Sequence, residues 1–345
     1  MTVPPSEHAP EHATEHAGAP GDLAAGLRPL EGGFSGETFL AETGGERSVV
    51  RIYAGGRGPV APSVDAAVLR LARGTVPVPQ VLEVRHGDPD RGLPGLLVTS
   101  FLPGTRGDLV LRRADPLADL LADPLAGSAG AGAEVASDEA LAALGEELGA
   151  ALARLAGIRM LRWGPFVDAD LSVGVHEPPY DVDGLPALVE VYADRLDHLT
   201  PAEWTGLRAA AVDAQAALDA VEGVCLVHSD ANPKNLLLDP ARPAGERLTG
   251  LVDWEYAHAG LPFTDLGNLV RHHRAPVFQD AAVATYADAL GVGVQEALVL
   301  ARAADLGALV DLASRRGDNP AAARADVLLR AIARAGDAAA DEPAG

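Results

Sequence analysis

The residues best suited to chemistry lie in the second half of the chain, each near the end of a short apolar run: Asp230, Asn235 and Asp253. If 236–239 pairs with 249–252 as an antiparallel hairpin, Asn235 comes close to Asp253, with Asp230 on the loop that leads into it. Amide and carboxylate oxygens are the protein ligands that Mg²⁺ accepts, and a further carboxylate can orient an attacking hydroxyl. The pattern predicts a phosphoryl-transfer centre in which Asn235 and Asp253 hold Mg²⁺ and Asp230 orients the acceptor.

Short strands and helices must position these residues. Runs of β-forming residues between turn residues predict strands, and apolar residues at helical spacing predict helices. Ser63 is expected to cap the first helix. The strands are predicted at 34–40, 48–53, 81–84 and 96–102, with a turn at 42–46, and the helices at 63–73, 138–156, 184–199, 203–221 and in a set from about 277 to 335.

The order of these elements predicts an α+β fold with two lobes. A small antiparallel sheet, within 22–102, forms the nucleotide-binding lobe, and 103–335 forms a larger, mainly helical lobe with the catalytic loop and the acceptor site. Within it, 115–137 is rich in Ala, Gly, Asp and Ser and is expected to be a flexible insertion. The segments 1–21 and 336–345 are expected to be disordered tails, because neither has the apolar residues to bury a core.

The chain resembles the aminoglycoside phosphotransferase and choline kinase-like family, relatives of the protein kinases. The resemblance rests on the motif His-Ser-Asp-x₄-Asn at 228–235 and on the run 253–267, and it covers roughly residues 25–335. In that family the catalytic loop is typically His-Gly-Asp…Asn, and Ser229 replaces the glycine here. The resemblance implies a bilobal protein-kinase-like fold, ATP and Mg²⁺ as cofactors, and transfer of the γ-phosphoryl group to a hydroxyl.

The resemblance also implies a nucleotide site in the first lobe. Ser35 and Gly36 lie in a glycine-rich turn whose N–H groups can approach phosphate oxygens, although the turn lacks strict G-x-G-x-x-G spacing. Kinases normally carry a Lys on the next strand and a Glu on the following helix, and the matching residues here are Arg51 and Asp65. Arg is always charged and binds phosphate through two N–H groups, so the exchange is chemically workable.

Four further residues have expected roles, two of them from the same resemblance. Ser100 and Leu102, before a Pro-Gly turn, are similar to the hinge whose backbone meets the adenine. By itself this pattern also fits an edge strand that binds nothing, and the rest of the constellation favours the hinge. His228 is expected to form structural hydrogen bonds in the loop, and Asp265 to cap a helix or anchor a loop.

Composition limits the partners. The formal net charge is −22, and Lys234 is the only lysine. Nucleic-acid binding requires clustered cations, so this acidic chain is not expected to bind nucleic acid. A negative field attracts cationic partners, and it fits simple solubility equally well.

The cellular setting is predicted from what the sequence lacks. Cys225 is the only cysteine, so neither an intrachain disulfide nor a cysteine-based metal cluster is expected. No stretch reaches the ~20 continuous apolar residues of a membrane helix, so no membrane partner is expected. The N-terminal residues lack the pattern of a secretory signal. A cytoplasmic protein, with access to ATP, is therefore expected.

The acceptor is a small hydroxyl-bearing molecule by this resemblance. Acceptors in the family are often cationic antibiotics, and also choline, ethanolamine, homoserine and fructosamines. Four acidic residues of the helical lobe could bind a polycation or form a solvated face: Glu255 near the catalytic loop, and Glu190, Asp194 and Asp197 on one helix. An antibiotic-inactivating kinase is the favoured function, and a metabolic small-molecule kinase is the alternative.

Two other classes remain as alternatives. The missing lysine suggests a nucleotide-binding regulatory pseudokinase, but Asp230, Asn235 and Asp253 are all present. A protein kinase proper is disfavoured because Asp-Trp-Glu stands where Asp-Phe-Gly would be and no Ala-Pro-Glu follows. The oligomeric state and the choice between ATP and GTP are left open.

Overall fold

The computed structural model describes most of the chain, namely residues 27–30, 37–53, 57–111, 137–271 and 275–340. Several predicted features fall outside these residues: Ser35 and Gly36 of the glycine-rich turn, the tail 1–21, and all of the insertion 115–137 except Ser137. Residues 336–340 are described, and Ala338 among them is buried.

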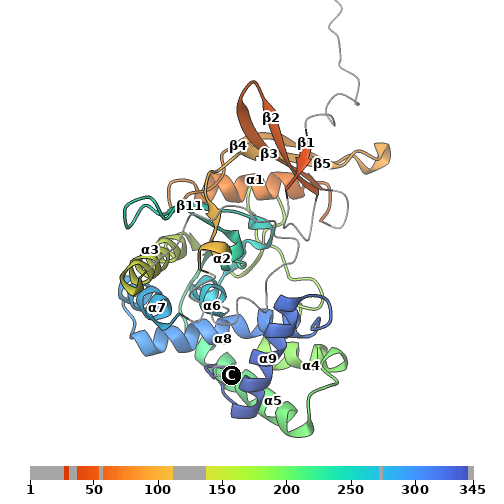
Figure 1. Cartoon of the computed structure of the whole chain (residues 1–345). Coiled ribbons are helices and arrows are strands. Elements are labelled where there is room, and N and C mark those ends of the chain that lie inside the picture. The colour runs from red at the N-terminus through yellow and green to blue at the C-terminus, as the bar shows by residue number, and fades with distance from the viewer. Residues whose placement is uncertain (1–26, 31–36, 54–56, 112–136, 272–274, 341–345) are drawn as a thin grey trace, which may run out of the picture.

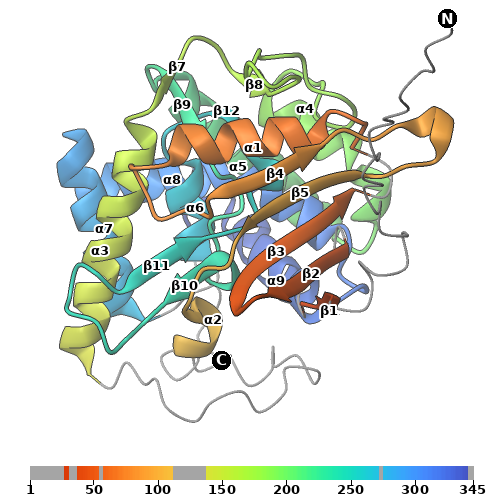
Figure 2. The same ribbon diagram turned by 90° about the horizontal axis from the view of Figure 1, so that it is seen from above.

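The first lobe is an antiparallel sheet of five strands in the order β1-β2-β3-β5-β4 (Figure 1). Gly44 and Gly45 both have positive φ, which a tight two-residue turn between β2 and β3 requires. Helix α1 (Ala61–Ala72) runs alongside β4 in Figure 2 and lies between the sheet and the second lobe in Figure 1. The strands are β1 (Leu27–Pro29), β2 (Glu37–Thr43), β3 (Glu46–Tyr53), β4 (Val81–Arg85) and β5 (Gly95–Ser100).

The start of α1 differs from the prediction. Val60 is the N-cap residue, and no side chain caps the helix. Ser63 lies inside the first turn, where its hydroxyl is hydrogen-bonded to Nε2 of His86. The predicted cap was therefore wrong, because Ala61 and Pro62 already belong to the helix and the Ser63 hydroxyl is engaged elsewhere.

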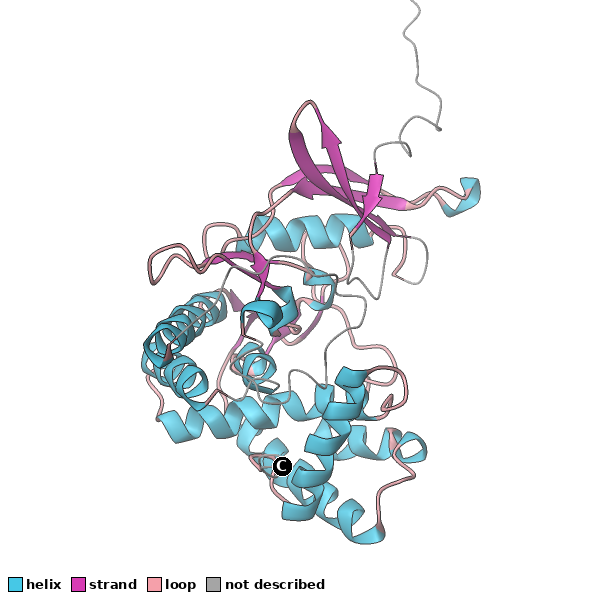
Figure 3. Cartoon of the chain, in the orientation of Figure 1, coloured by secondary structure: helices cyan, strands magenta, loops and turns pink. Residues whose placement is uncertain are grey.

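The second lobe is mainly helical, and Figure 3 shows its helices gathered below the strands of the first lobe. Helix α3 packs against α7, α6 against α8, and α5 against both α8 and α9. A Cβ atom added to Gly149 of α3 would meet the carbonyl oxygen of Ala282 in α7 at 2.4 Å, so this close crossing requires glycine. The helices are α2 (Gly107–Val110), α3 (Asp138–Ala156), α4 (Gly184–Val191), α5 (Pro201–Asp219), α6 (Thr264–Arg271), α7 (Pro276–Leu290), α8 (Val294–Ala313) and α9 (Pro320–Ala335).

The predicted helix 184–199 is shorter than expected. Helix α4 ends at Val191, and a 3₁₀ turn, η5 (Ala193–Arg195), follows it. The chain turns because the Tyr192 side chain is buried and its hydroxyl donates to Asp311 of α8 at 2.8 Å. As a result, the acidic residues Glu190, Asp194 and Asp197 do not share one helix.

The second lobe also contains two small sheets. One has the order β11-β10-β6, and the other β7-β9-β12-β8. Leu236 of β10 lies opposite Leu251 of β11, so the predicted hairpin is confirmed. The strands are β6 (Thr105–Arg106), β7 (Arg159–Met160), β8 (Gly164–Pro165), β9 (Val224–Val227), β10 (Leu236–Leu238), β11 (Leu248–Leu251) and β12 (His258–Gly260).

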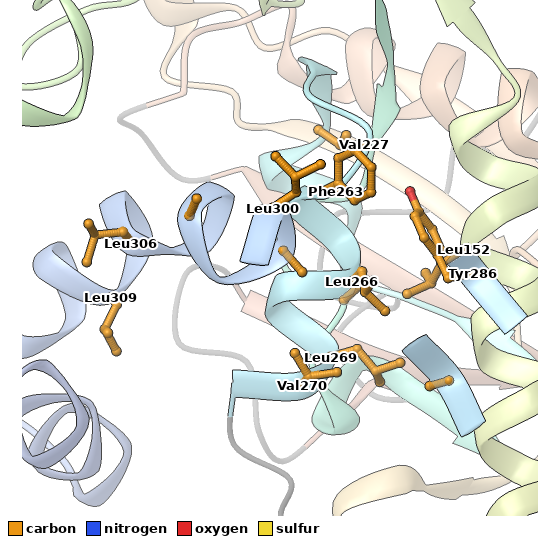
Figure 4. Close-up of a cluster of buried hydrophobic side chains, with 14 of the residues drawn as sticks. Leu152, Val227, Phe263, Leu266, Leu269, Val270, Tyr286, Leu300, Leu306 and Leu309 are labelled. Atoms are coloured by element: carbon orange, nitrogen blue, oxygen red, sulfur yellow. The ribbon is translucent and has the colours of Figure 1, made fainter. Parts of the chain in front are cut away.

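Helix α6 passes through the centre of the buried core. Its Leu266 and Leu269 are fully buried and lie among Leu152 of α3 and Leu300 of α8 in Figure 4. Burying each such leucine side chain stabilises the fold by about 1.5–3 kcal/mol. The helix is therefore fixed in place beneath the loop that follows β9. The predicted two-lobed α+β architecture is confirmed.

None of the helices in the described ranges has both the length and the apolar character that a membrane span requires.

Candidate active site

The hairpin of β10 and β11 brings the three predicted residues together. The N–H of Val252 donates to the carbonyl oxygen of Asn235 at 3.0 Å, which places Asp253 beside Asn235. The Asn235 side chain donates through Nδ2 to the Asp230 carboxylate at 2.7 Å and to the Asp230 carbonyl oxygen at 2.9 Å. Since both bonds use Nδ2, the Oδ1 atom of Asn235 is the one that can face a cation.

The catalytic loop, as we call residues 228–235, is held from below by α6. Both carboxylate oxygens of Asp265 accept backbone N–H groups, from His228 at 2.9 Å and from Ser229 at 2.7 Å. Asn268, one turn later, accepts the N–H of Ala231 through Oδ1 at 3.3 Å. Burial raises the pKa of Asp265 to about 6, and the two N–H donors oppose that rise. Asp265 is thus a loop anchor, as predicted.

A buried ion pair supports this anchor in turn. Arg271 of α6 binds Asp305 of α8 through two guanidinium nitrogens, with Nε at 2.5 Å from Oδ2. Asn268 donates to the same carboxylate at 2.9 Å. Asn268, Arg271 and Asp305 were not predicted from the sequence, although Asp265, Asn268 and Arg271 stand at i, i+3 and i+6 and so share one helix face.

The charge state of Asp230 is set by its surroundings. Burial raises its pKa to about 6, while hydrogen bonds from Asn232 and Asn235 and the positive charge of Arg271 oppose the rise. Asn232 donates to Oδ1 at 2.6 Å. Asp230 is therefore a carboxylate at neutral pH with more proton affinity than an exposed one, which suits a group that accepts a proton from a hydroxyl.

His228 forms the structural hydrogen bonds expected of it. Its Nε2 lies 2.9 Å from the carbonyl oxygen of Val252, and its Nδ1 accepts the N–H of Asp230 at 3.2 Å. Burial lowers its pKa to about 4, so the ring is neutral at physiological pH. His228 links the loop to the hairpin and has no nitrogen left for proton transfer.

Two residues of the site have left-handed backbone conformations. Ser229 has φ 65° and Asp253 has φ 64°. Such a conformation costs a residue with a Cβ atom roughly 1–2 kcal/mol. The φ of Ser229 gives a physical reason why glycine is usual at this position of the resembling family.

The cation of the first lobe reaches across to the second. Arg51, on β3, donates through one terminal nitrogen to Asp253 Oδ1 at 2.9 Å and through the other to the Glu255 carboxylate. The Glu255 side chain is only 4% exposed. The Glu255 carboxylate is therefore buried against Arg51 rather than on a solvated face, and polycation binding by Glu255 stays a prediction.

Asp65, matched to the acidic partner of Arg51, binds other residues. The Asp65 carboxylate, on α1, accepts two hydrogen bonds from Arg57 at 2.8 Å each and one from the Tyr53 hydroxyl at 2.6 Å. The resemblance matches Asp65 to the acidic partner of the strand cation, but both of its carboxylate oxygens instead bind Arg57, which follows β3. Arg57 lies in a turn without any periodic pattern, so nothing in the sequence pointed to it.

The hinge segment lies where the first lobe joins the second. Ser100, the last residue of β5, is hydrogen-bonded twice to Gln80, through its N–H at 2.8 Å and its hydroxyl at 2.9 Å. Leu102, two residues later, packs beside Gly250 of β11. A role for either residue in adenine binding stays a prediction.

The donor set at Asn235 and Asp253 fits magnesium. In the part of the chain that the structure describes, no three His, Cys, Asp or Glu side chains form a group that could hold a metal ion by themselves. Mg²⁺ commonly takes only one or two protein oxygens, with phosphates and waters completing its shell. The Asp253 carboxylate is partly exposed and already attracts a positive group, the guanidinium of Arg51.

Comparison with solved structures identifies the class of fold. The apo form of a thermostable mutant of aminoglycoside phosphotransferase APH(4)-Ia is 19% identical with a TM-score of 0.57, covering 90% of this chain and 94% of that one. The GDP complex of aminoglycoside 2'-phosphotransferase-IIIa is 16% identical with a TM-score of 0.59, covering 90% and 92%. A ternary complex of an APH(4)-Ia mutant with ADP and hygromycin B is 17% identical with a TM-score of 0.54, covering 88% and 93%.

The sequence itself gives the family. The model of the phosphotransferase enzyme family (APH) matches residues 26–303, so the chain belongs to that family and is a phosphotransferase. A search among curated proteins gave no match.

Proposed function

We propose that this protein transfers the γ-phosphoryl group of ATP to a hydroxyl of a small cationic molecule, and that its natural acceptor is an antibiotic that it inactivates. The observation that carries the phosphotransfer is the joint placement of Asp230, Asn235 and Asp253 on one loop and hairpin, with Arg51 reaching them from the other lobe. The neighbour that holds ADP and hygromycin B supports a nucleotide and a hydroxyl-bearing acceptor in this fold.

Each of these residues has one role in the proposal. Asp230 orients the acceptor hydroxyl and takes up its proton as the oxygen attacks. Asn235 Oδ1 and Asp253 would hold Mg²⁺, and Arg51 would bind the phosphates. When bound, Mg²⁺ supplies positive charge that stabilises the transferred phosphoryl group. The chain keeps all of these groups, which favours an active enzyme over a regulatory pseudokinase.

The cationic acceptor rests on charge. The net charge of −22 produces a field that concentrates cations and repels anions. Acidic residues remain at the surface of the helical lobe, and the Asp197 side chain is 76% exposed. A metabolic kinase for choline, homoserine or a fructosamine is the second candidate, because choline and fructosamines also carry positive charge. We place the reaction in the cytoplasm, where ATP is available.

The test is Mg²⁺-dependent release of ADP by the purified full chain across cationic antibiotics and small amino-alcohols, with GTP tried beside ATP. Asp230→Ala should abolish turnover while Mg·ATP still binds, since the carboxylate acts on the acceptor. Asp213→Ala, an exposed aspartate on α5, is the matched control and should retain turnover. If no acceptor supports turnover, or if Asp230→Ala keeps full activity, the proposal fails.

A further inference from the structure

Asp65 is a nearly buried carboxylate whose negative charge must be compensated. Its side chain is 6% exposed, and Arg57 grips it with two parallel hydrogen bonds of 2.8 Å. The Tyr53 hydroxyl adds a third at 2.6 Å. Because a buried carboxylate without a partner is costly, Asp65 would seek another cation if Arg57 were removed.

Arg51 is an alternative cation in the same region. It stands two residues before Tyr53 on β3, so both side chains leave the same face of the sheet. The guanidinium groups of Arg51 and Arg57 lie 5.5 and 5.8 Å from the centre of the Tyr53 ring. The Tyr53 hydroxyl donates to Asp65, so Arg51 and Asp65 lie next to the same side chain.

Both arginines point to the same segment of the second lobe. Arg51 binds the carboxylates of Asp253 and Glu255, and Arg57 donates to the carbonyl oxygen of Glu255 at 2.9 Å. The two arginines share Glu255, since Arg57 also lies 3.9 Å from its carboxylate, but they differ in their other carboxylate partners. Arg57 neutralises Asp65 on α1, and Arg51 faces Asp253, where metal and phosphates would bind.

We propose that Arg57 is a positioning residue for nucleotide binding: by occupying Asp65, it keeps Arg51 directed at Asp253 and at the phosphates. This inference rests on the proposed function, since it concerns the same nucleotide site. It implies that the single lysine–glutamate pair of kinases is replaced here by two arginines with separate tasks, one that compensates the helix carboxylate and one that meets the nucleotide.

The decisive measurement is the Kd of Mg·ADP for the full chain, by calorimetry, with thermal unfolding of each variant as a check on folding. Arg57→Gln should weaken binding about tenfold, because the freed Asp65 draws Arg51 away. The double variant Arg57→Gln/Asp65→Asn should return to within about threefold of the unmodified chain, since the competing charge is gone. Arg85→Gln, an exposed arginine bonded to Glu83 within β4, is the matched control and should bind normally.

The double variant distinguishes a role of Arg57 in positioning Arg51 from a role in holding α1 in place. If the Arg57–Asp65 pair only braced α1, removing both partners would leave binding as weak as in Arg57→Gln, and that result would overturn the inference. Normal binding by Arg57→Gln would overturn it as well. If the unmodified chain binds no nucleotide while remaining folded, the proposed function fails, and this inference falls with it.

A second pair of variants serves if Arg57→Gln does not fold. Asp65→Asn should weaken Mg·ADP binding by less than about threefold, whereas Arg51→Gln should weaken it by at least about tenfold. An equal loss in both would show that Asp65 is itself the working partner of Arg51, and the proposed division of tasks would be wrong.

Discussion

The two halves of the site are held in different ways. The catalytic loop rests on α6, where Asp265 and Asn268 bind its backbone and a buried pair, Arg271–Asp305, lies underneath with side chains 5% exposed. Arg51, the cation expected to bind the nucleotide, is held by carboxylates of the opposite lobe. Its side chain is 15% exposed, and that of its partner Asp253 is 31% exposed. The catalytic loop is therefore fixed by the packed core, whereas Arg51 depends on ion pairs that include the partly exposed Asp253.

Because of this difference, substitutions beneath the catalytic loop should affect folding stability, and substitutions at Arg51 should affect nucleotide affinity. Removing a group beneath the loop leaves a buried charge without compensation, so the cost falls on folding. Removing Arg51, whose partner Asp253 is partly exposed, changes which charges pair at the nucleotide site, so the cost falls on affinity. The predictions below test this separation, from the largest expected effect to the smallest.

Arg271→Met should lower the free energy of unfolding by about 3–5 kcal/mol, because it leaves Asp305 buried without its cation. Denaturant unfolding followed by circular dichroism measures the loss. Arg315→Met is the matched control: Arg315 pairs with Asp311 on the surface of the same region, with a side chain 47% exposed, and should cost less than about 1 kcal/mol. A loss for Arg271→Met no larger than for this control would remove the distinction between the two halves.

Glu203 is a buried carboxylate outside the site, and its contribution to stability is expected to depend on pH. It caps α5 by accepting the N–H of Thr200 at 2.9 Å, and it pairs with Arg330 and Arg334 of α9. These bonds, led by the backbone N–H of Thr200, lower its pKa from 4.5 to about 2. A lowered folded-state pKa stabilises the protein above pH 4.5, and that stability is lost as the pH falls toward 2.

Glu203→Gln should therefore cost about 1–2 kcal/mol at pH 7 and progressively less as the pH falls through this range. Unfolding measured at several pH values tests it, with Glu222→Gln as the control at an exposed position beyond the end of α5. A difference between Glu203→Gln and the unmodified chain that stays constant from pH 7 down to pH 3 would contradict the assignment.

Ser229→Gly should have the smallest effect and the opposite sign. Glycine adopts φ 65° without the strain of a Cβ atom, so the variant should gain about 0.5–1 kcal/mol of stability and keep its turnover. Thermal unfolding reports the gain, and Gly291→Ser, at φ 72° after α7, should give the reverse. A destabilised Ser229→Gly would mean that the serine side chain makes a contact that matters more than the backbone.

The predictable part of the site is the part that is local in sequence. Asn235 and Asp253 flank a hairpin, and the hairpin register follows from two apolar runs joined by a turn. The loop anchor Asp265 could be predicted from its motif, and the i, i+3, i+6 spacing of α6 also contained Asn268 and Arg271.

The rest depends on contacts that no local pattern records. Helix α4 stops at Val191 because Tyr192 meets Asp311, 119 residues later in the chain. Arg57 stands in an irregular turn, and only the folded arrangement of β3, α1 and η7 (Trp254–Tyr256) brings it to Asp65 and Glu255. Several cations could have paired with Asp65, and three-dimensional proximity alone selected Arg57.

Lys234 allows the site to be labelled selectively at an amine. It is the only lysine of the chain and lies exposed in the short 3₁₀ turn η6 (Pro233–Asn235), between Asn232 and the magnesium-binding candidate Asn235. Since Arg51 has no primary amine, a reagent that acylates amines has a single side chain to modify, beside the catalytic loop. A fluorophore attached there would lie beside the catalytic loop, and no other lysine would have to be removed first.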